Sequence, residues 1–117
     1  MKSEHEFFPA NDQPWQETDQ KGVLERVLAR DERDPEILTR LARWLPGVET
    51  EGVITHEYVE EVYILAGDLQ DITLDSAFRL GDYASRQPGM RHGPYRTETG
   101  CIILEVRYRA SEANPPA

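Results

Sequence analysis

Two histidines and one glutamate are the residues of this chain best suited to hold a metal ion. His56 and Glu60 are separated by three residues, and His92 follows later in the turn-rich stretch QPGMRHGPY. Neutral imidazoles and a carboxylate are ligands for Fe, Zn, Mn or Ni, and two histidines with one carboxylate can form a facial triad with open coordination positions. The alternative for His92 is a loop histidine that only hydrogen-bonds to the backbone.

The phase of the predicted strand directs two of these residues inward. In a strand beginning near Val53, even-numbered side chains share one face. That face carries His56 and Glu60 together with apolar residues: Ile54, Val62 and Ile64. A carboxylate on an inward face is costly unless a charge or hydrogen bonds compensate it, and a divalent cation is one such compensation. A one-residue shift would present Glu61 instead.

The elements that must position these residues are short strands. From Val53 onward, runs rich in β-branched and aromatic residues recur about every ten to fifteen positions between turn residues, which is typical of an antiparallel sandwich or barrel. Glycine occupies the expected sharp turns: Gly67, Gly81, Gly89, Gly93 and Gly100. The second half of the chain therefore predicts an all-β fold.

The stretch from Gly22 to Leu45 is ambiguous. Its first half has apolar residues at helical spacing, and Asp34-Pro35 could begin a second helix. Each half is also short enough for a strand. If the second half is a strand, its side chains alternate between two faces, and one face consists of Ile37, Thr39, Leu41, Arg43 and Leu45.

Composition limits the classes of partner. The chain has 117 residues, 30% of them charged, and a net charge of −9, so nucleic acid and anionic membranes would be repelled. No apolar run approaches the roughly 18 residues of a membrane helix. The single Cys101 cannot form an internal disulfide and, at the start of an apolar strand, is expected to be a buried inert thiol. We predict a cytoplasmic protein.

One domain is expected, flanked by two peripheral segments. Residues 1–20 are polar, with two prolines, and form an N-terminal arm. Three aromatic side chains are available to dock the arm: Phe7, Phe8 and Trp15. Residues 21–110 form the domain, and residues 111–117 are a polar, proline-bearing tail.

The motif spacings resemble those of the cupin superfamily. His56, three residues, Glu60, six residues and Gly67 match the first cupin motif. Gly81, six residues, Pro88-Gly89, two residues and His92 match the second. Over residues 15–109 the chain is similar to small single-domain cupins related to the cupin domain of zinc-dependent anti-sigma factors and to acetylacetone- or dihydroxyacetophenone-type dioxygenases. The resemblance implies an antiparallel double-stranded β-helix, the RmlC-like jelly-roll barrel, with strands in residues 22–45.

One position departs from the cupin pattern. The first motif should carry a further histidine where this chain has Ile54. The ligand set that the resemblance implies is therefore reduced to His56, Glu60 and His92. The loss of a nitrogen donor should weaken the binding of a divalent metal. Hydrogen bonds to the remaining ligands can restore part of this affinity. The resemblance also implies a homodimer formed through an edge strand and the arm.

Four further residues are candidates for contact with a small organic ligand, although each also has an ordinary packing or solvated role: Arg43, Tyr58, Met90 and Tyr95. No residue is assigned a catalytic role. The resemblance implies a dioxygenase-like oxidoreductase acting on a carbonyl or phenolic compound. The alternatives are a non-catalytic sensor of metal or ligand, and an oligomer with a vestigial site.

Overall fold

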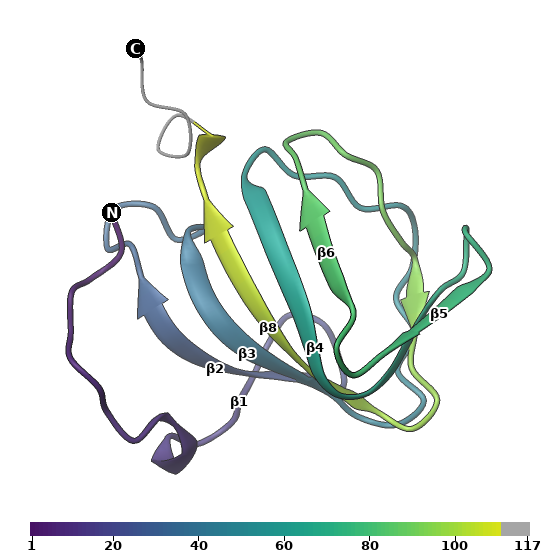
Figure 1. Ribbon diagram of the computed structural model, residues 1–117, viewed down its shortest axis with the longest axis horizontal. Coiled ribbons are helices and arrows are strands. Elements are labelled where there is room, and N and C mark those ends of the chain that lie inside the picture. Colours follow the sequence, from purple (N-terminus) through teal and green to yellow (C-terminus); the bar gives the residue numbers. More distant parts are fainter. Residues whose placement is uncertain (111–117) are drawn as a thin grey trace.

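Residues 1–110 are described by the computed structural model, so the predicted tail at 111–117 lies outside the described residues. The elements are the short 3-10 helix η1 (Ala10–Asp12) and the strands β1 (Gln16–Glu17), β2 (Val23–Arg30), β3 (Leu38–Trp44), β4 (Val59–Asp71), β5 (Ser76–Arg79), β6 (Tyr83–Arg86), β7 (Tyr95–Arg96) and β8 (Cys101–Tyr108) (Figure 1). No helix within the described residues is long and apolar enough to cross a membrane.

The long strand β4 joins the two parts of the barrel. The main path of pairing is β1-β2-β3-β8-β4-β5, and β6 and β7 also pair with β4. The first half of β4 pairs with β8 and β6, and its second half pairs with β5 and β7. All pairs are antiparallel, and the sheet curves around an interior (Figure 1). The predicted all-β jelly-roll barrel is confirmed.

The ambiguous stretch forms a hairpin of two strands. β3 is hydrogen-bonded along its length to β2 on one side and β8 on the other, and these long-range ladders override the local helical spacing. Asp34 accepts hydrogen bonds from backbone groups of the turn between β2 and β3 rather than from a helix. The Glu36 N–H donates to Oδ1 of Asp34 at 3.3 Å, and the Ile37 N–H donates to the carbonyl oxygen of Asp34 at 3.0 Å. A side chain that could begin a helix thus closes a hairpin.

The face of β3 that points inward is the opposite of the predicted one. Arg40 reaches Glu105 of β8 at 2.8 Å, and Ala42 is completely buried. Arg43 is exposed. Of the two roles left open for Arg43, the structure therefore supports the solvated one and not contact with a ligand inside the barrel. The reason is register: a bulge in β2 between Val27 and Ala29 and the pairing with β8 set the phase of β3, and alternation alone does not reveal either feature.

The face predicted for β4 is correct. Glu60, Val62 and Ile64 are buried, whereas Tyr63 is exposed. A register shift against β8 follows Ile64, and Gly67 lies there with a φ of +81°. A Cβ atom at Gly67 would be 1.9 Å from the Gly100 carbonyl oxygen, so only glycine allows the two backbones to approach. The kink carries β4 from the first part of the barrel into the second.

The interior has an apolar end and a charged end. The apolar core consists of Val23, Ala42, Val62, Ile64, Leu69, Tyr95, Cys101 and Ile103. Burial raises the pKa of the Cys101 thiol to about 12, which makes it an inert packing group, as expected. The charged end is built from glutamates and arginines of neighbouring strands and adjoins the predicted metal ligands.

The first residues of the chain follow β2. The Ser3 N–H donates to the Arg30 carbonyl oxygen at 3.2 Å, and the guanidinium of Arg26 lies 4.2 Å from the centre of the Trp15 ring. Of the aromatics expected to dock, Trp15 makes this contact and Phe8 packs edge-on against His5. Phe7 is fully exposed.

Candidate metal centre and adjoining cavity

The fold brings together the three predicted ligand residues. His56 lies just before β4, Glu60 lies in β4, and His92 lies in the segment after β6. The nitrogen and oxygen atoms that could bind metal all lie within 4.8 Å of one another. An isolated bridge fixes the distant partner: the Ile54 N–H donates to the His92 carbonyl oxygen at 2.7 Å, and the His92 N–H donates to the Ile54 carbonyl oxygen at 3.0 Å.

Backbone carbonyls fix the tautomer of both imidazoles. Nδ1 of His56 lies 3.0 Å from the Tyr58 carbonyl oxygen, and Nδ1 of His92 lies 3.1 Å from the Met90 carbonyl oxygen. A carbonyl oxygen can only accept, so each Nδ1 carries the hydrogen. In the neutral rings Nε2 then keeps its lone pair, which is the arrangement that ligating histidines require.

The Nε2 atom of His56 has no hydrogen-bond partner. It is one of two buried side-chain polar atoms in that state among residues 1–110, the other being Nε1 of Trp44. Oε1 of Glu60 lies 3.6 Å away, and as an acceptor it cannot pair with the lone pair of a neutral Nε2. A buried polar atom left unsatisfied costs about 1–3 kcal/mol. A cation bound between the two imidazoles and the carboxylate would satisfy it, so the donor set fits a divalent metal.

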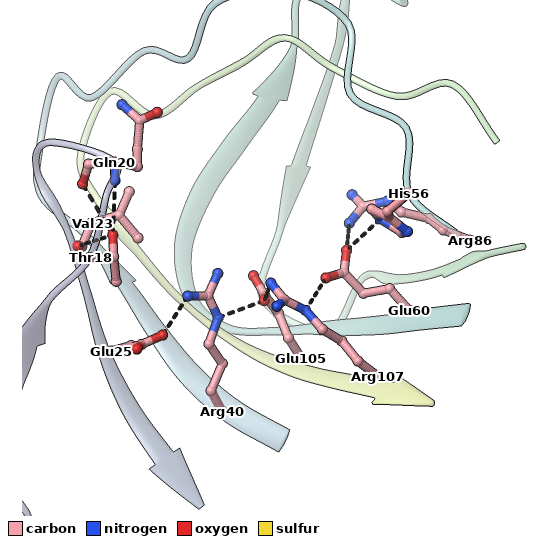
Figure 2. Close-up of polar contacts among 10 residues, drawn as sticks. All are labelled: Thr18, Gln20, Val23, Glu25, Arg40, His56, Glu60, Arg86, Glu105 and Arg107. Atoms are coloured by element: carbon pink, nitrogen blue, oxygen red, sulfur yellow. Dashed lines mark hydrogen bonds and ion pairs between the residues drawn. The ribbon is translucent and has the colours of Figure 1, made fainter. Parts of the chain in front are cut away.

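Two arginines already hold the carboxylate of Glu60. Nη1 of Arg86 donates to Oε1 at 2.8 Å, and Nε of Arg107 donates to Oε2 at 3.0 Å (Figure 2). Burial opposes ionisation, but the contact with His56 and the charges of Arg107 and Arg86 outweigh it, so the pKa of Glu60 lies well below its usual range. Each carboxylate oxygen has a second lone pair available for a metal.

The two imidazoles have different environments. The contact with Glu60 raises the pKa of His56 despite its burial. Burial, followed by the nearby charge of Arg86, lowers the pKa of His92. Without a metal, His56 is therefore the imidazole that more readily takes a proton, and His92 is the one that stays neutral.

A cavity of about 390 Å³ adjoins the cluster. Its wall includes Arg86, Tyr95 and the predicted metal ligand His92, and Nη2 of Arg86 donates to the Tyr95 hydroxyl at 2.7 Å. Most of the remaining wall is apolar and includes Val62, Ile64, Leu69, Leu74, Phe78 and Met90. A mostly apolar cavity with a small number of polar groups in its wall is typical of a small-molecule site.

The four predicted ligand contacts have separate positions. Met90 and Tyr95 line the cavity. Tyr58 is buried outside it, with its ring stacked on that of His56 at 4.0 Å between centres, so it covers this predicted metal ligand. Arg43 is exposed on the outside of β3. Ile54 is half-buried against the apolar core, so the missing histidine has been replaced by a packing residue.

Sequence reasoning missed the arginines. Arg86, Arg107 and Arg40 all point into the barrel, where they form ion pairs with glutamates (Figure 2). In the sequence such residues resemble the solvated positions of a strand. The available signal is the phase of β8: Glu105 and Arg107 share parity with the buried Cys101 and Ile103.

Comparison with known proteins places the chain in a family. No curated protein matches it. An RmlC-like cupin from Shewanella frigidimarina superposes with a TM-score of 0.73 at 20% identity over 96% of each chain. The polyketide cyclase RemF from Streptomyces resistomycificus superposes with a TM-score of 0.69 at 18% identity, over 89% of this chain and 79% of that one.

A third solved structure is that of the Rhodobacter sphaeroides sigma factor SigE in complex with the anti-sigma factor ChrR. The match has a TM-score of 0.61 at 23% identity, over 83% of this chain and 49% of that one. At these identities the structures support the fold alone. The family model described as the ChrR cupin-like domain matches residues 3–110, almost the whole chain, and this chain therefore belongs to the ChrR cupin-like domain family of cupins.

Proposed function

We propose that the barrel binds one divalent metal ion through His56, Glu60 and His92 and holds a small organic molecule in the adjoining cavity. The observation that carries the proposal is the pinning of both imidazoles through Nδ1, with the possible ligand atoms of all three residues within 4.8 Å. Imidazole and carboxylate ligands suit Fe, Zn, Mn or Ni. With three protein ligands, coordination positions stay open for the organic molecule.

The chain's own residues would divide the work as follows. A bound metal would act as a Lewis acid toward an oxygen atom of the ligand. Arg86 and the Tyr95 hydroxyl would orient polar groups of the ligand, because both lie in the cavity wall and are bonded to each other. The apolar wall would bind the rest of the molecule and exclude water. A dioxygenase-like oxidation of a carbonyl or phenolic compound is the form of catalysis that we propose to test.

A second candidate is a non-catalytic sensor. Glu60 is already paired with Arg86 and Arg107, so the barrel does not need a metal to compensate this carboxylate. A metal could therefore bind and dissociate without unfolding the protein. Membership of a family described by ChrR, whose solved structure is a complex with a sigma factor, supports a regulatory protein as the partner of such a sensor.

Metal content is the test of the proposed function. Protein purified without added metal should contain about one Fe, Zn, Mn or Ni ion per chain, as one triad implies. His92→Ala should contain none, whereas Arg79→Ala, at an exposed position of β5, should retain the wild-type content. Wild-type protein that neither carries metal nor binds it when Fe, Zn, Mn and Ni are each added would contradict the proposal.

Turnover separates the enzyme from the sensor. Metal-loaded protein should consume oxygen with small diketones or hydroxylated aromatics if it is an enzyme. Metal-dependent capture of a purified sigma factor from the source organism, without turnover, would favour the sensor. The homodimer and the cytoplasmic location remain predictions, and light scattering on the purified protein tests the first.

A further inference from the structure

Alternating charges cross the interior of the barrel in one continuous chain of ion pairs (Figure 2). Glu25 pairs with Arg40 at 2.6 Å, and Arg40 pairs with Glu105 at 2.8 Å. Arg107 then joins Glu105 at 3.2 Å to Glu60 at 3.0 Å. Arg86, 2.8 Å from Glu60, ends the chain. The members come from β2, β3, β8, β4 and β6, so the chain spans the first part of the barrel.

The ion-pair chain is electrically balanced. It contains three carboxylates and three guanidiniums, and their side chains are between 6% and 19% exposed. A guanidinium cannot lose its charge under ordinary conditions. One more buried carboxylate, Asp71, lines the cavity, and its Oδ1 accepts the N–H of Leu74. Two exposed residues of opposite charge, Asp82 and Arg91, also line the cavity.

A divalent cation beside Glu60 would upset this balance. The three protein ligands include only one carboxylate, and its charge is already matched within the ion-pair chain. The metal would therefore give the ion-pair chain a net charge of +2. When the carboxylate of Asp71 is counted with it, the net charge would be +1. Uncompensated charge is expensive in a low-dielectric interior, so a negative group should be drawn into the adjoining cavity.

Arg86 belongs to both sites. It donates through Nη1 to the predicted metal ligand Glu60 and through Nη2 to the Tyr95 hydroxyl, and it lines the cavity. The described hydrogen bonds use two of its five N–H groups. Arg107 also pairs with Glu60 but is not part of the cavity wall, because its guanidinium lies over the ring of Tyr58 at 5.0 Å.

We propose that a metal ion and a small organic anion bind to this barrel cooperatively, with Arg86 as the residue that links them. The anion is a monocarboxylate with an apolar body: one negative charge answers the excess positive charge, a carboxylate matches the guanidinium, and the apolar wall takes the rest. This inference rests on the proposed metal site and adds the class of ligand and its dependence on metal.

The experiment is isothermal titration calorimetry of Zn²⁺ into metal-free protein, alone, with saturating benzoate, and with benzamide as the uncharged molecule of the same shape. Benzoate should tighten Zn²⁺ binding by about tenfold or more, which is within the usual range of coupling between sites. Benzamide should change it by less than about twofold. Zn²⁺ should tighten benzoate binding by the same factor as benzoate tightens Zn²⁺ binding, since coupling is reciprocal. Weak complexes of benzoate with free Zn²⁺ would act in the opposite direction.

Two variants locate the link. In Arg86→Gln a competing cation leaves Glu60, so Zn²⁺ should bind at least as tightly as in the wild type while the benzoate effect falls toward one. Arg79→Gln, at an exposed position outside the cavity wall, should retain both wild-type values. If Arg86 were only a structural support, its loss would weaken Zn²⁺ binding and leave the benzoate effect unchanged for the protein that binds.

The outcomes separate this inference from the function on which it rests. Zn²⁺ binding that is unaffected by benzoate, or affected equally by benzamide, would overturn the cooperative anion site and leave the metal site standing. A complete absence of Zn²⁺ binding would overturn both. The comparison of benzoate with benzamide uses the wild-type protein, so it decides the question even if Arg86→Gln does not fold.

Discussion

Arg86 donates a hydrogen bond to Glu60 at 2.8 Å and so places a permanent positive charge beside the carboxylate that would bind a metal. The same carboxylate receives a second guanidinium from Arg107. In this barrel Glu60 is an internal counter-ion, and binding of the proposed metal would compete with that role. The balance between them should be visible in stability and in metal affinity.

Replacing Glu60 by glutamine should destabilise the metal-free protein by about 3 kcal/mol, because two buried guanidiniums lose their shared counter-ion. Chemical unfolding would measure the free energy. Glu61→Gln is the matched control: the neighbouring carboxylate accepts a bond from the exposed Tyr83 hydroxyl, and its loss should cost less than about 1 kcal/mol. Equal effects of the two variants would show that the ion pairs of Glu60 contribute no more than a surface contact.

Replacing Ile54 by histidine should restore a nitrogen donor at the site. The backbone of Ile54 pairs with that of His92, so an imidazole at residue 54 would lie near the predicted ligand His92. We expect metal to bind at least about tenfold more tightly, the lower end of the effect that changes around metal ligands produce. Thr55→His is the control, since residue 55 is exposed and has the opposite phase. An unchanged affinity in Ile54→His would count against the cupin alignment of this motif.

Replacing Gly67 by alanine should destabilise the protein more than the same change at Gly47. Both glycines have positive φ, +81° and +84°, so both variants incur a backbone cost of about 1–2 kcal/mol. Only at Gly67 would the new Cβ collide with backbone, whereas no atom lies within 4 Å of a Cβ at Gly47. Thermal melts of the two variants test this, and equal losses would mean that the close approach to Gly100 is not required.

Asp68 should make part of the stability depend on pH. Burial raises the pKa of its carboxyl, but hydrogen bonds from Thr99, the Glu98 N–H and Thr97 outweigh this and lower it. A depressed folded pKa gives stability that is present above the unfolded value, about 3.9, and is lost as pH falls through the folded value. As the pH falls below about 4, the free energy of unfolding of Asp68→Asn should therefore decrease less than that of the wild type. An identical acid profile for the two proteins would contradict this role.

The all-β character of the second half could be predicted from local pattern, whereas the barrel and the grouping of the three candidate metal ligands came from the cupin resemblance. Period-two alternation from Val53 onward indicated the inward phase of His56 and Glu60, and the resemblance to the cupin motifs implied His92 as their partner. Tyr95 and Met90 were adjacent to His92 in the sequence and do line the cavity.

The charged interior could not be predicted in the same way. Which face of β3 is buried depends on the bulge in β2 and on pairing with β8, a strand more than fifty residues away. A shift of one residue exchanges the two faces of the strand, so the sequence offered Arg43 as a candidate and gave no sign of Arg40. Arg86 and Arg107 enter the interior as partners of Glu60, and this pairing between separate strands exists only in the assembled barrel.

The most direct test of the metal centre is anomalous X-ray diffraction from crystals of the protein grown with Zn²⁺ and measured at the zinc absorption edge. We predict one peak about 2.0–2.1 Å from Nε2 of both His56 and His92, with an oxygen of Glu60 at a similar distance. Crystals with no peak between these residues, and with Arg86 still bonded to Glu60, would contradict the account.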